Sequence, residues 1–164
     1  MASGNSLLIF TPLNNQPPAS SYATLNVRNS HATLDFDAAS NESALFGAVL
    51  PTHYAGGGLT VVLMWMAATA TSGNVVWNAA IERHQQTTDD LDSDSFATAQ
   101  AATAAAPGTS GQVQYTTITF TSGAQMDSLA AGESFRIKVT RDAANVSDTM
   151  AGDAQLLRAF IKET

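Results

Sequence analysis

The stretch Leu59–Ala68, which reads LTVVLMWMAA, decides the fold. Alternate positions from Leu59 to Trp65 are apolar, and the positions between them hold mainly valine and methionine, so both faces of the segment need cover. The run is far shorter than the about 20 apolar residues that a membrane helix needs. It therefore predicts a central β-strand that is covered on both faces.

The tripeptide Thr-Ser-Gly occurs at residues 71–73, 109–111 and 121–123, each time beside an apolar or alternating run. Glycine reaches positive φ without steric cost and serine can bond its own backbone, so each tripeptide predicts a turn between strands. The runs between the turns predict about nine strands, at residues 7–11, 23–27, 32–36, 44–50, 59–68, 75–83, 113–120, 134–141 and 154–162.

Three of these segments, and one stretch outside them, carry more specific predictions. In residues 23–27, alternate side chains face inward, which places Ala23, Leu25 and Val27 in the core. Residues 113–120 change phase midway, which predicts a β-bulge near Thr116 and Thr117.

Residues 154–162 place Leu157, Ala159 and Ile161 on one face. Residues 96–106 are rich in alanine but interleaved with threonine, and they predict a loop or an edge strand.

Together the runs predict an all-β fold, an antiparallel two-sheet β-sandwich that is jelly-roll-like. The length of 164 residues favours a single domain over 1–164, with residues 1–22 as a partly extended N-terminal arm. We expect the core to contain Leu34, Phe36, Leu63, Trp77, Ile118, Phe135, Ile137 and Ile161.

The composition limits the classes of function that the chain can have. Charged residues make up 13% of the chain, against about 25% in an average domain, so the surface is largely neutral and rich in small residues. The net charge of −7 would be repelled by phosphate, which argues against nucleic acid as a partner. The chain has no cysteine, which excludes disulfides and thiolate metal sites. With no targeting or membrane segment visible, we expect a soluble protein made in the cytoplasm.

The acidic segment around residue 92 is the most suggestive chemical feature. Asp90, Asp92 and Asp94 have the alternate spacing of calcium ligands. An EF-hand would then need glycine and glutamate where this chain has Ser95 and Ala101, so that motif fails. A different calcium loop stays open, but the favoured interpretation is a solvated loop kept extended by its like charges.

Catalytic motifs are missing from the sequence. His31, His53 and His84 have no zinc-ligand spacing, and no Gly-x-Ser-x-Gly motif occurs. We therefore assign no catalytic, cofactor or firm metal residue and expect a protein that is not an enzyme. Trp65 and Trp77 would make a sugar-stacking platform if they were exposed, but their apolar register predicts core packing.

Basic residues gather near the C-terminus. Five of the seven lie on the last two predicted strands, mostly on the polar face of each strand. This pattern is typical of a solvated sheet face, and it also fits a docking face for an acidic partner. The candidate partner-binding residues are Arg136, Lys138, Arg141, Arg158 and Lys162.

The chain resembles the jelly-roll capsid decoration (cement) proteins of tailed bacteriophages. The likeness rests on four stretches: YAGGGLTV (54–61), SGNVVW (72–77), LDSDSF (91–96) and MAGDA (150–154). They are similar to the family in the general character of their residues and are not diagnostic motifs. The resemblance implies a structural virion protein that binds the outer surface of the phage head and stabilises it. It also implies the major capsid protein as a partner, a homotrimer, a location on the capsid surface and no catalytic residues.

Two other classes of function remain open. One is a carbohydrate-binding, lectin-like module of a phage tail fibre or receptor-binding protein, which needs an exposed aromatic pair or a calcium loop. The other is a sandwich-fold hydrolase, which needs two convergent carboxylates in a cleft.

Overall fold

The segment Leu59–Ala67 forms the strand β5 in the middle of a sheet. In the computed structural model, which describes residues 4–164, β5 hydrogen-bonds on one side to β10 (Ala154–Glu163) and on the other side to β8 (Gln114–Phe120). Every residue of β5 except Met64 is buried. The predicted central strand, covered on both faces, is confirmed.

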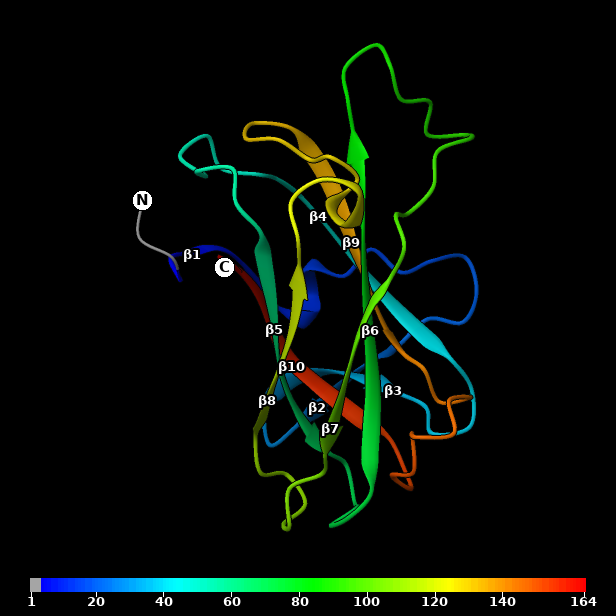
Figure 1. Ribbon diagram of the computed structural model, residues 1–164. Coiled ribbons are helices and arrows are strands. Elements are labelled where there is room, and N and C mark those ends of the chain that lie inside the picture. The colour runs from blue at the N-terminus through cyan, green and yellow to red at the C-terminus, as the bar shows by residue number, and fades with distance from the viewer. Residues whose placement is uncertain (1–3) are drawn as a thin grey trace.

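Ten strands in the described part of the chain form two antiparallel sheets that pack face to face (Figure 1). Sheet A has the order β2 (Thr24–Arg28), β3 (His31–Phe36), β10, β5, β8, and β1 (Ser6–Phe10) also pairs with β10. Sheet B has the order β4 (Glu42–Val49), β9 (Ser134–Arg141), β6 (Asn74–His84), β7 (Gln100–Ala105). Two 3₁₀ turns, η1 (Pro12–Asn14) and η2 (Ala124–Met126), complete the elements.

The predicted all-β, two-sheet antiparallel sandwich is therefore confirmed. The tenth strand is β7, which lies in the stretch expected to be a loop or an edge strand and pairs with β6 alone. Among residues 4–164, no helix is long and apolar enough to span a membrane.

The core lies between the two sheets. Trp65 of sheet A and Trp77 of sheet B are both fully buried and meet edge to face, with ring centroids 5.8 Å apart. Phe36 packs edge-on against Trp77 at 5.0 Å. All eight residues predicted for the core are buried there: Leu34, Phe36, Leu63, Trp77, Ile118, Phe135, Ile137 and Ile161.

The bulge predicted in residues 113–120 is wrong. The strand β8 pairs with β5 without a register shift, with Tyr115 exposed and Thr116 facing the core. Thr116 is buried because its Oγ1 accepts a hydrogen bond from Nε1 of Trp65 at 2.8 Å. A buried indole N–H needs an acceptor, so a hydroxyl occupies an inward position and the apolar pattern only seemed to change phase.

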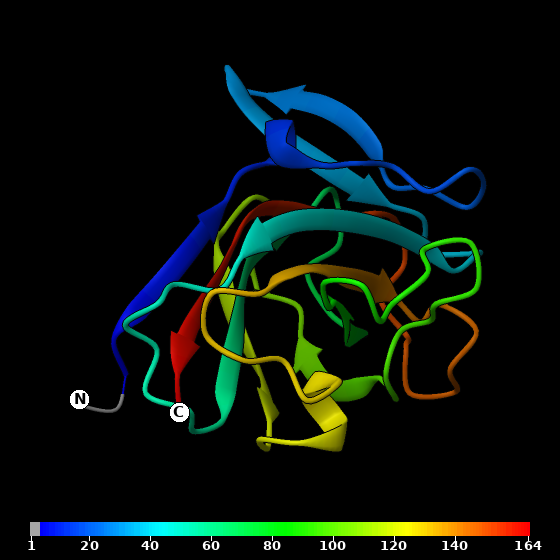
Figure 2. The ribbon, with the colours of Figure 1, turned by 90° about the horizontal axis from the view of Figure 1, so that it is seen from above.

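The inward assignment of residues 23–27 holds for Ala23 and is wrong for Leu25 and Val27, which are exposed. The strand β2 is the last strand of sheet A, and Figure 2 shows the β2–β3 hairpin standing out from the rest of the sandwich. Leu25 pairs with the core residue Leu34, but nothing from sheet B covers it.

The strand β10 contains a register shift that the sequence pattern missed. The shift lies between Leu156 and Arg158 in the pairing with β5. As a result Leu156 enters the core, while Leu157, predicted to face inward, is only half-buried. Ala159 and Ile161 are buried as predicted.

The N-terminal arm was predicted over residues 1–22, of which residues 1–3 lie outside the described part. After β1 and η1 the chain runs along the free edge of β4, where the backbone N–H of Gln16 donates to the Leu45 carbonyl at 2.8 Å. Further on, Ala23 donates to the Ser43 carbonyl at 3.0 Å. The arm therefore covers an edge that sheet B would otherwise leave open.

A buried arginine closes one end of the sandwich. Arg141, at the end of β9, is fully buried and forms an ion pair with Asp148 at 2.8 Å. Its guanidinium also donates to the carbonyls of Phe36, Met150 and Gly152. Arg141 thus holds sheet A, sheet B and the β9–β10 connection together, and it is unavailable as the docking residue predicted from the sequence.

We expect Arg141→Met to lower the free energy of unfolding by about 3–5 kcal/mol, because it leaves the Asp148 carboxylate buried without its partner. Urea unfolding at neutral pH measures the change. Lys162→Met, which removes a positive charge from the surface of β10, is the matched control and should change stability by less than about 0.5 kcal/mol. Equal effects of the two substitutions would contradict this role of Arg141.

Candidate functional site

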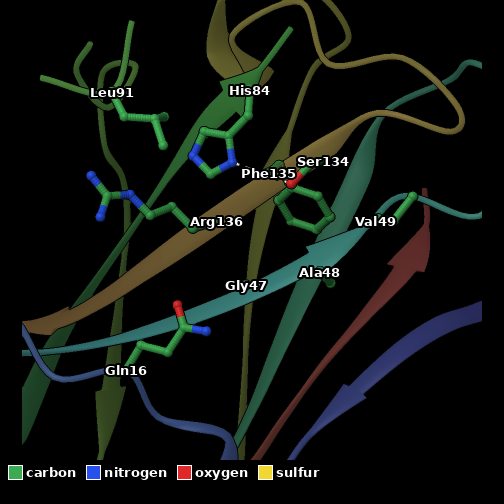
Figure 3. Close-up of a pocket in the computed structure, with 9 residues that line it drawn as sticks. All are labelled: Gln16, Gly47, Ala48, Val49, His84, Leu91, Ser134, Phe135 and Arg136. Atoms are coloured by element: carbon green, nitrogen blue, oxygen red, sulfur yellow. Dashed lines mark hydrogen bonds between the residues drawn. The ribbon is translucent and has the colours of Figure 1, made fainter. Parts of the chain in front are cut away.

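A groove crosses the outer face of sheet B, where a cavity of about 460 Å³ opens to solvent (Figure 3). Its floor is formed by β4 and β9, on which Val49 pairs with Ser134 and Gly47 pairs with Arg136. Gly47 contributes no side chain, and a Cβ at this position would lie 3.3 Å from Oε1 of Gln16. The floor is therefore open at its centre.

The loop of residues 85–99 forms one wall of the groove. It folds back over sheet B, and the Ala97 N–H donates to the Ile81 carbonyl at 2.9 Å. The Phe96 ring lies 5.0 Å from the Arg136 guanidinium and 4.6 Å from Nζ of Lys138. These cation–π contacts fasten the loop to the sheet. The N-terminal arm forms the opposite wall through Gln16.

The charge at the groove floor is held by one ion pair. The Glu82 carboxylate is fully buried and accepts two hydrogen bonds from Arg136, through Nε and Nη2. These hydrogen bonds raise the pKa of the Arg136 guanidinium above its ordinary value. Arg136 therefore presents a fixed, planar and permanently charged donor to the groove.

His84 and Ser134 connect the groove to a second hollow. The His84 Nδ1 lies 3.2 Å from the Ser134 Oγ, and its Nε2 has no hydrogen-bond partner among residues 4–164. The adjoining hollow, of about 670 Å³, shares His84, Leu91 and Ser134 with the groove and adds Gln85, Gln86, Asp89 and Glu133. The two hollows adjoin and form one channel, with both polar and apolar lining, at this end of sheet B.

The carboxylates near the channel are engaged in structural contacts. Asp89 accepts the Gln85 N–H and lies 3.7 Å from Nε of Arg83. Glu133 accepts the Ala130 N–H at 2.9 Å. With Glu82 bound to Arg136, each of these acids already has a structural partner.

The acidic segment forms a tight turn and not the extended loop that the sequence suggested. The Asp90 carbonyl accepts the N–H groups of Ser93 and Asp94, and its side chain accepts the Asp92 N–H at 3.1 Å. Within the described residues, no three His, Asp or Glu side chains are arranged to hold a metal ion. The weak calcium candidate Asp90, Asp92 and Asp94 is therefore not brought together.

We expect millimolar Ca²⁺ to leave the melting temperature of the protein nearly unchanged, because the Asp90 and Asp94 carboxylates bond the backbone of their own turn. Calcium bound at 100 times its dissociation constant would instead add about 2.7 kcal/mol of stability. Thermal unfolding with Ca²⁺ and with a chelator makes the comparison. A rise of several degrees that depends on Ca²⁺ would revive the calcium loop.

The five candidate docking residues do not form one face, which corrects the expectation from the sequence. Arg136 and Lys138 lie on the outer face of sheet B, while Arg158 and Lys162 lie on the outer face of sheet A. The last two strands belong to different sheets, so neighbours in the sequence lie on opposite sides of the molecule. Arg141 is buried between them.

The sequence pattern also missed the site itself. Gln16, Gly47, His84, Leu91 and Arg136 come from five separate segments and match no motif. One signal was present, because Gly47 interrupts an apolar strand. A glycine inside a strand often marks a site where a ligand or another backbone segment approaches closely. As predicted, neither tryptophan is exposed, so they make no sugar-stacking platform.

Comparisons with known proteins bear on the fold. No protein-family model and no curated protein sequence matches the chain. Among solved structures, the CBM22-2 xylan-binding domain of Paenibacillus barcinonensis Xyn10C superposes with a TM-score of 0.53 and 15% identity, over 92% of each chain. This likeness shows a shared jelly-roll sandwich fold.

Two further structures are more distant carbohydrate-binding modules. The C-terminal CBM6 of LamC from Zobellia galactanivorans has a TM-score of 0.47 and 7% identity, over 95% of this chain and 98% of that one. The CBM6cm-2 module of Cellvibrio mixtus lichenase 5A, in complex with cellotriose, has a TM-score of 0.45 and 10% identity, over 98% and 99%.

Proposed function

We propose that the protein is a non-catalytic carbohydrate-binding domain that holds a glycan chain in the groove of sheet B. The observation that carries the proposal is an open groove lined by the planar polar side chains of Gln16, His84 and Arg136, of which His84 contacts Ser134 and Arg136 is fixed by Glu82. Sugar hydroxyls need donors and acceptors in fixed positions, and their C–H faces need small apolar contacts, which Val49 and Leu91 offer.

The fold supports this proposal over an enzyme. The sandwich is shared with a domain described as xylan-binding. The acids Glu82, Asp89 and Glu133 are engaged in structural contacts, so the described residues that line the groove and the channel include no free carboxylate pair of the kind that glycoside hydrolysis uses. These acids and the net charge of −7 also favour a neutral glycan over a polyanionic one.

The test uses isothermal titration with soluble neutral polysaccharides, among them xylan, mannan and mixed-linkage β-glucan. We expect at least one of them to bind, and we expect no new reducing ends after long incubation. Gly47→Tyr would fill the groove floor in a strand that accepts aromatic residues, and it should weaken binding about tenfold or more. Thr117→Tyr, at an exposed position on sheet A, is the matched control.

Binding that Gly47→Tyr leaves unchanged would place the glycan elsewhere. Failure of every neutral polysaccharide to bind the unmodified protein would contradict the proposal as a whole.

We also propose, as a second function, the capsid decoration role that the resemblance implies, with the major capsid protein as partner. An exposed apolar patch favours it: Leu13, Tyr22, Leu25 and Val27 are 73%, 50%, 55% and 65% exposed. Three of them, Leu13, Tyr22 and Leu25, line one hollow of about 320 Å³ that no charged side chain lines. Such patches commonly mark protein–protein contacts.

This second proposal predicts that the double variant Leu25→Ser, Val27→Ser reduces the amount of protein that stays on purified phage particles, because it removes apolar area from the patch. Particles that lack the protein should also lose their contents at a lower temperature. Shells without the protein, or particles equally robust without it, would rule the role out.

A further inference from the structure

Two of the seven basic residues have no side-chain partner among the residues that the structure describes. Arg28, Arg83, Arg136, Lys138 and Arg141 each contact a carbonyl, a carboxylate or the Phe96 ring. Arg158 and Lys162 have no hydrogen bond, ion pair or aromatic contact within residues 4–164. Both lie on the outer face of β10, in a molecule whose net charge is −7.

Arg158 stands at the rim of a hollow of about 370 Å³ on the side of sheet A. Four of the eight residues that line it are apolar: Pro12, Leu13, Ala32 and Leu157. The register shift in β10 contributes to it, because Leu157 faces the hollow instead of the core.

The polar side chains that line the hollow are Thr11, Ser30, His31 and Arg158, and the guanidinium of Arg158 is the only permanent charge among them. His31 lies beside Arg158, and its imidazole can donate a hydrogen bond. No acid lines the hollow. A fitting ligand therefore has an apolar point flanked by negative charge.

The turn Asp90–Leu91–Asp92 carries an apolar side chain between two negative charges. Leu91 is 62% exposed at the tip of the loop, and an exposed aspartate stands on each side of it. The turn is held in shape by the hydrogen bonds of its backbone to the Asp90 carbonyl, at 2.8 and 2.9 Å. A tip that is ordered before contact loses little conformational entropy on binding.

We propose that the turn Asp90–Leu91–Asp92 of one copy of this chain docks into the hollow beside Arg158 of a second copy. Leu91 contacts the apolar residues of the hollow, and the two carboxylates meet Arg158 and His31. Tip and hollow lie on different parts of the molecule, so the contact is heterologous and each copy keeps one free tip and one free hollow. Repetition builds a closed ring or an open filament, and a ring of three would be the trimer expected from the resemblance.

The experiment measures self-association of the full chain by sedimentation velocity over a wide range of protein concentration. We expect the unmodified protein to form oligomers that high salt weakens, since the contact pairs partly exposed charges. Arg158→Glu should raise the dissociation constant about tenfold or more, and Asp92→Lys should do the same. The double variant Arg158→Glu, Asp92→Lys restores an opposite-charge pair and should recover much of the association.

Lys162→Glu is the matched control. It makes the same charge change on the same face of β10, about 13 Å further along the strand and outside the hollow. It should leave the dissociation constant within a few-fold of the unmodified protein. Leu91→Ser tests the apolar contact and should weaken association, while circular dichroism and thermal melting confirm that each variant folds.

Three results would overturn the proposal. The unmodified protein could remain monomeric at the highest concentration, Arg158→Glu and Lys162→Glu could act equally, or the charge-swapped double variant could associate no better than either single variant. Glycan binding provides an independent readout for Arg158→Glu, because Arg158 lies on the sheet opposite the groove, whereas Leu91 lines the groove and Leu91→Ser should weaken both kinds of binding.

Discussion

A single buried cation, the guanidinium of Arg141, connects the two sheets at one end of the sandwich. Arg141 ends β9 in sheet B, and its guanidinium bonds the carbonyl of Phe36 at the end of β3 in sheet A. Asp148 neutralises it and also accepts the Val76 N–H at 3.0 Å, which ties the β9–β10 connection to β6. A buried charge is tolerated only when it is paired and hydrogen-bonded, so this end of the sandwich has one workable arrangement. The groove lies near the other end of β6, at His84, where a second ion pair, between the buried Glu82 and Arg136, lies on the outer face of sheet B.

Most of the fold could be predicted because alternation reports burial directly. The strand β9 alternates strictly and was predicted residue for residue, and β5 was correctly predicted to be covered on both faces. The errors share a cause: alternation assumes that each inward position is apolar and that each apolar position has a sheet above it. Thr116 breaks the first assumption because Trp65 needs an acceptor, and Leu25 breaks the second because β2 overhangs the sandwich.

The site was less predictable than the fold, for a geometric reason. The last two strands are adjacent in the sequence, and their basic residues suggested one docking face. The connection between them crosses from sheet B to sheet A, so it separates Arg136 from Arg158 by the thickness of the sandwich. The groove depends on the arm and on the loop of residues 85–99 reaching sheet B through Gln16 and Phe96. Contacts between segments so distant in the sequence leave no spacing that a motif could capture.

The placement of charge bears on how an acidic protein could associate with copies of itself through the proposed contact. With few charged residues, most of the positive ones are used up in internal contacts. The acids left over keep copies apart at long range, but that repulsion is screened beyond about 8 Å at physiological salt. At contact distance only the local chemistry counts, and there the acidic tip faces a hollow without acids, with Arg158 at its rim. The proposed contact leaves the groove floor on β4 and β9 uncovered, but it uses Leu91, which also lines the groove, so docking and glycan binding would share that side chain.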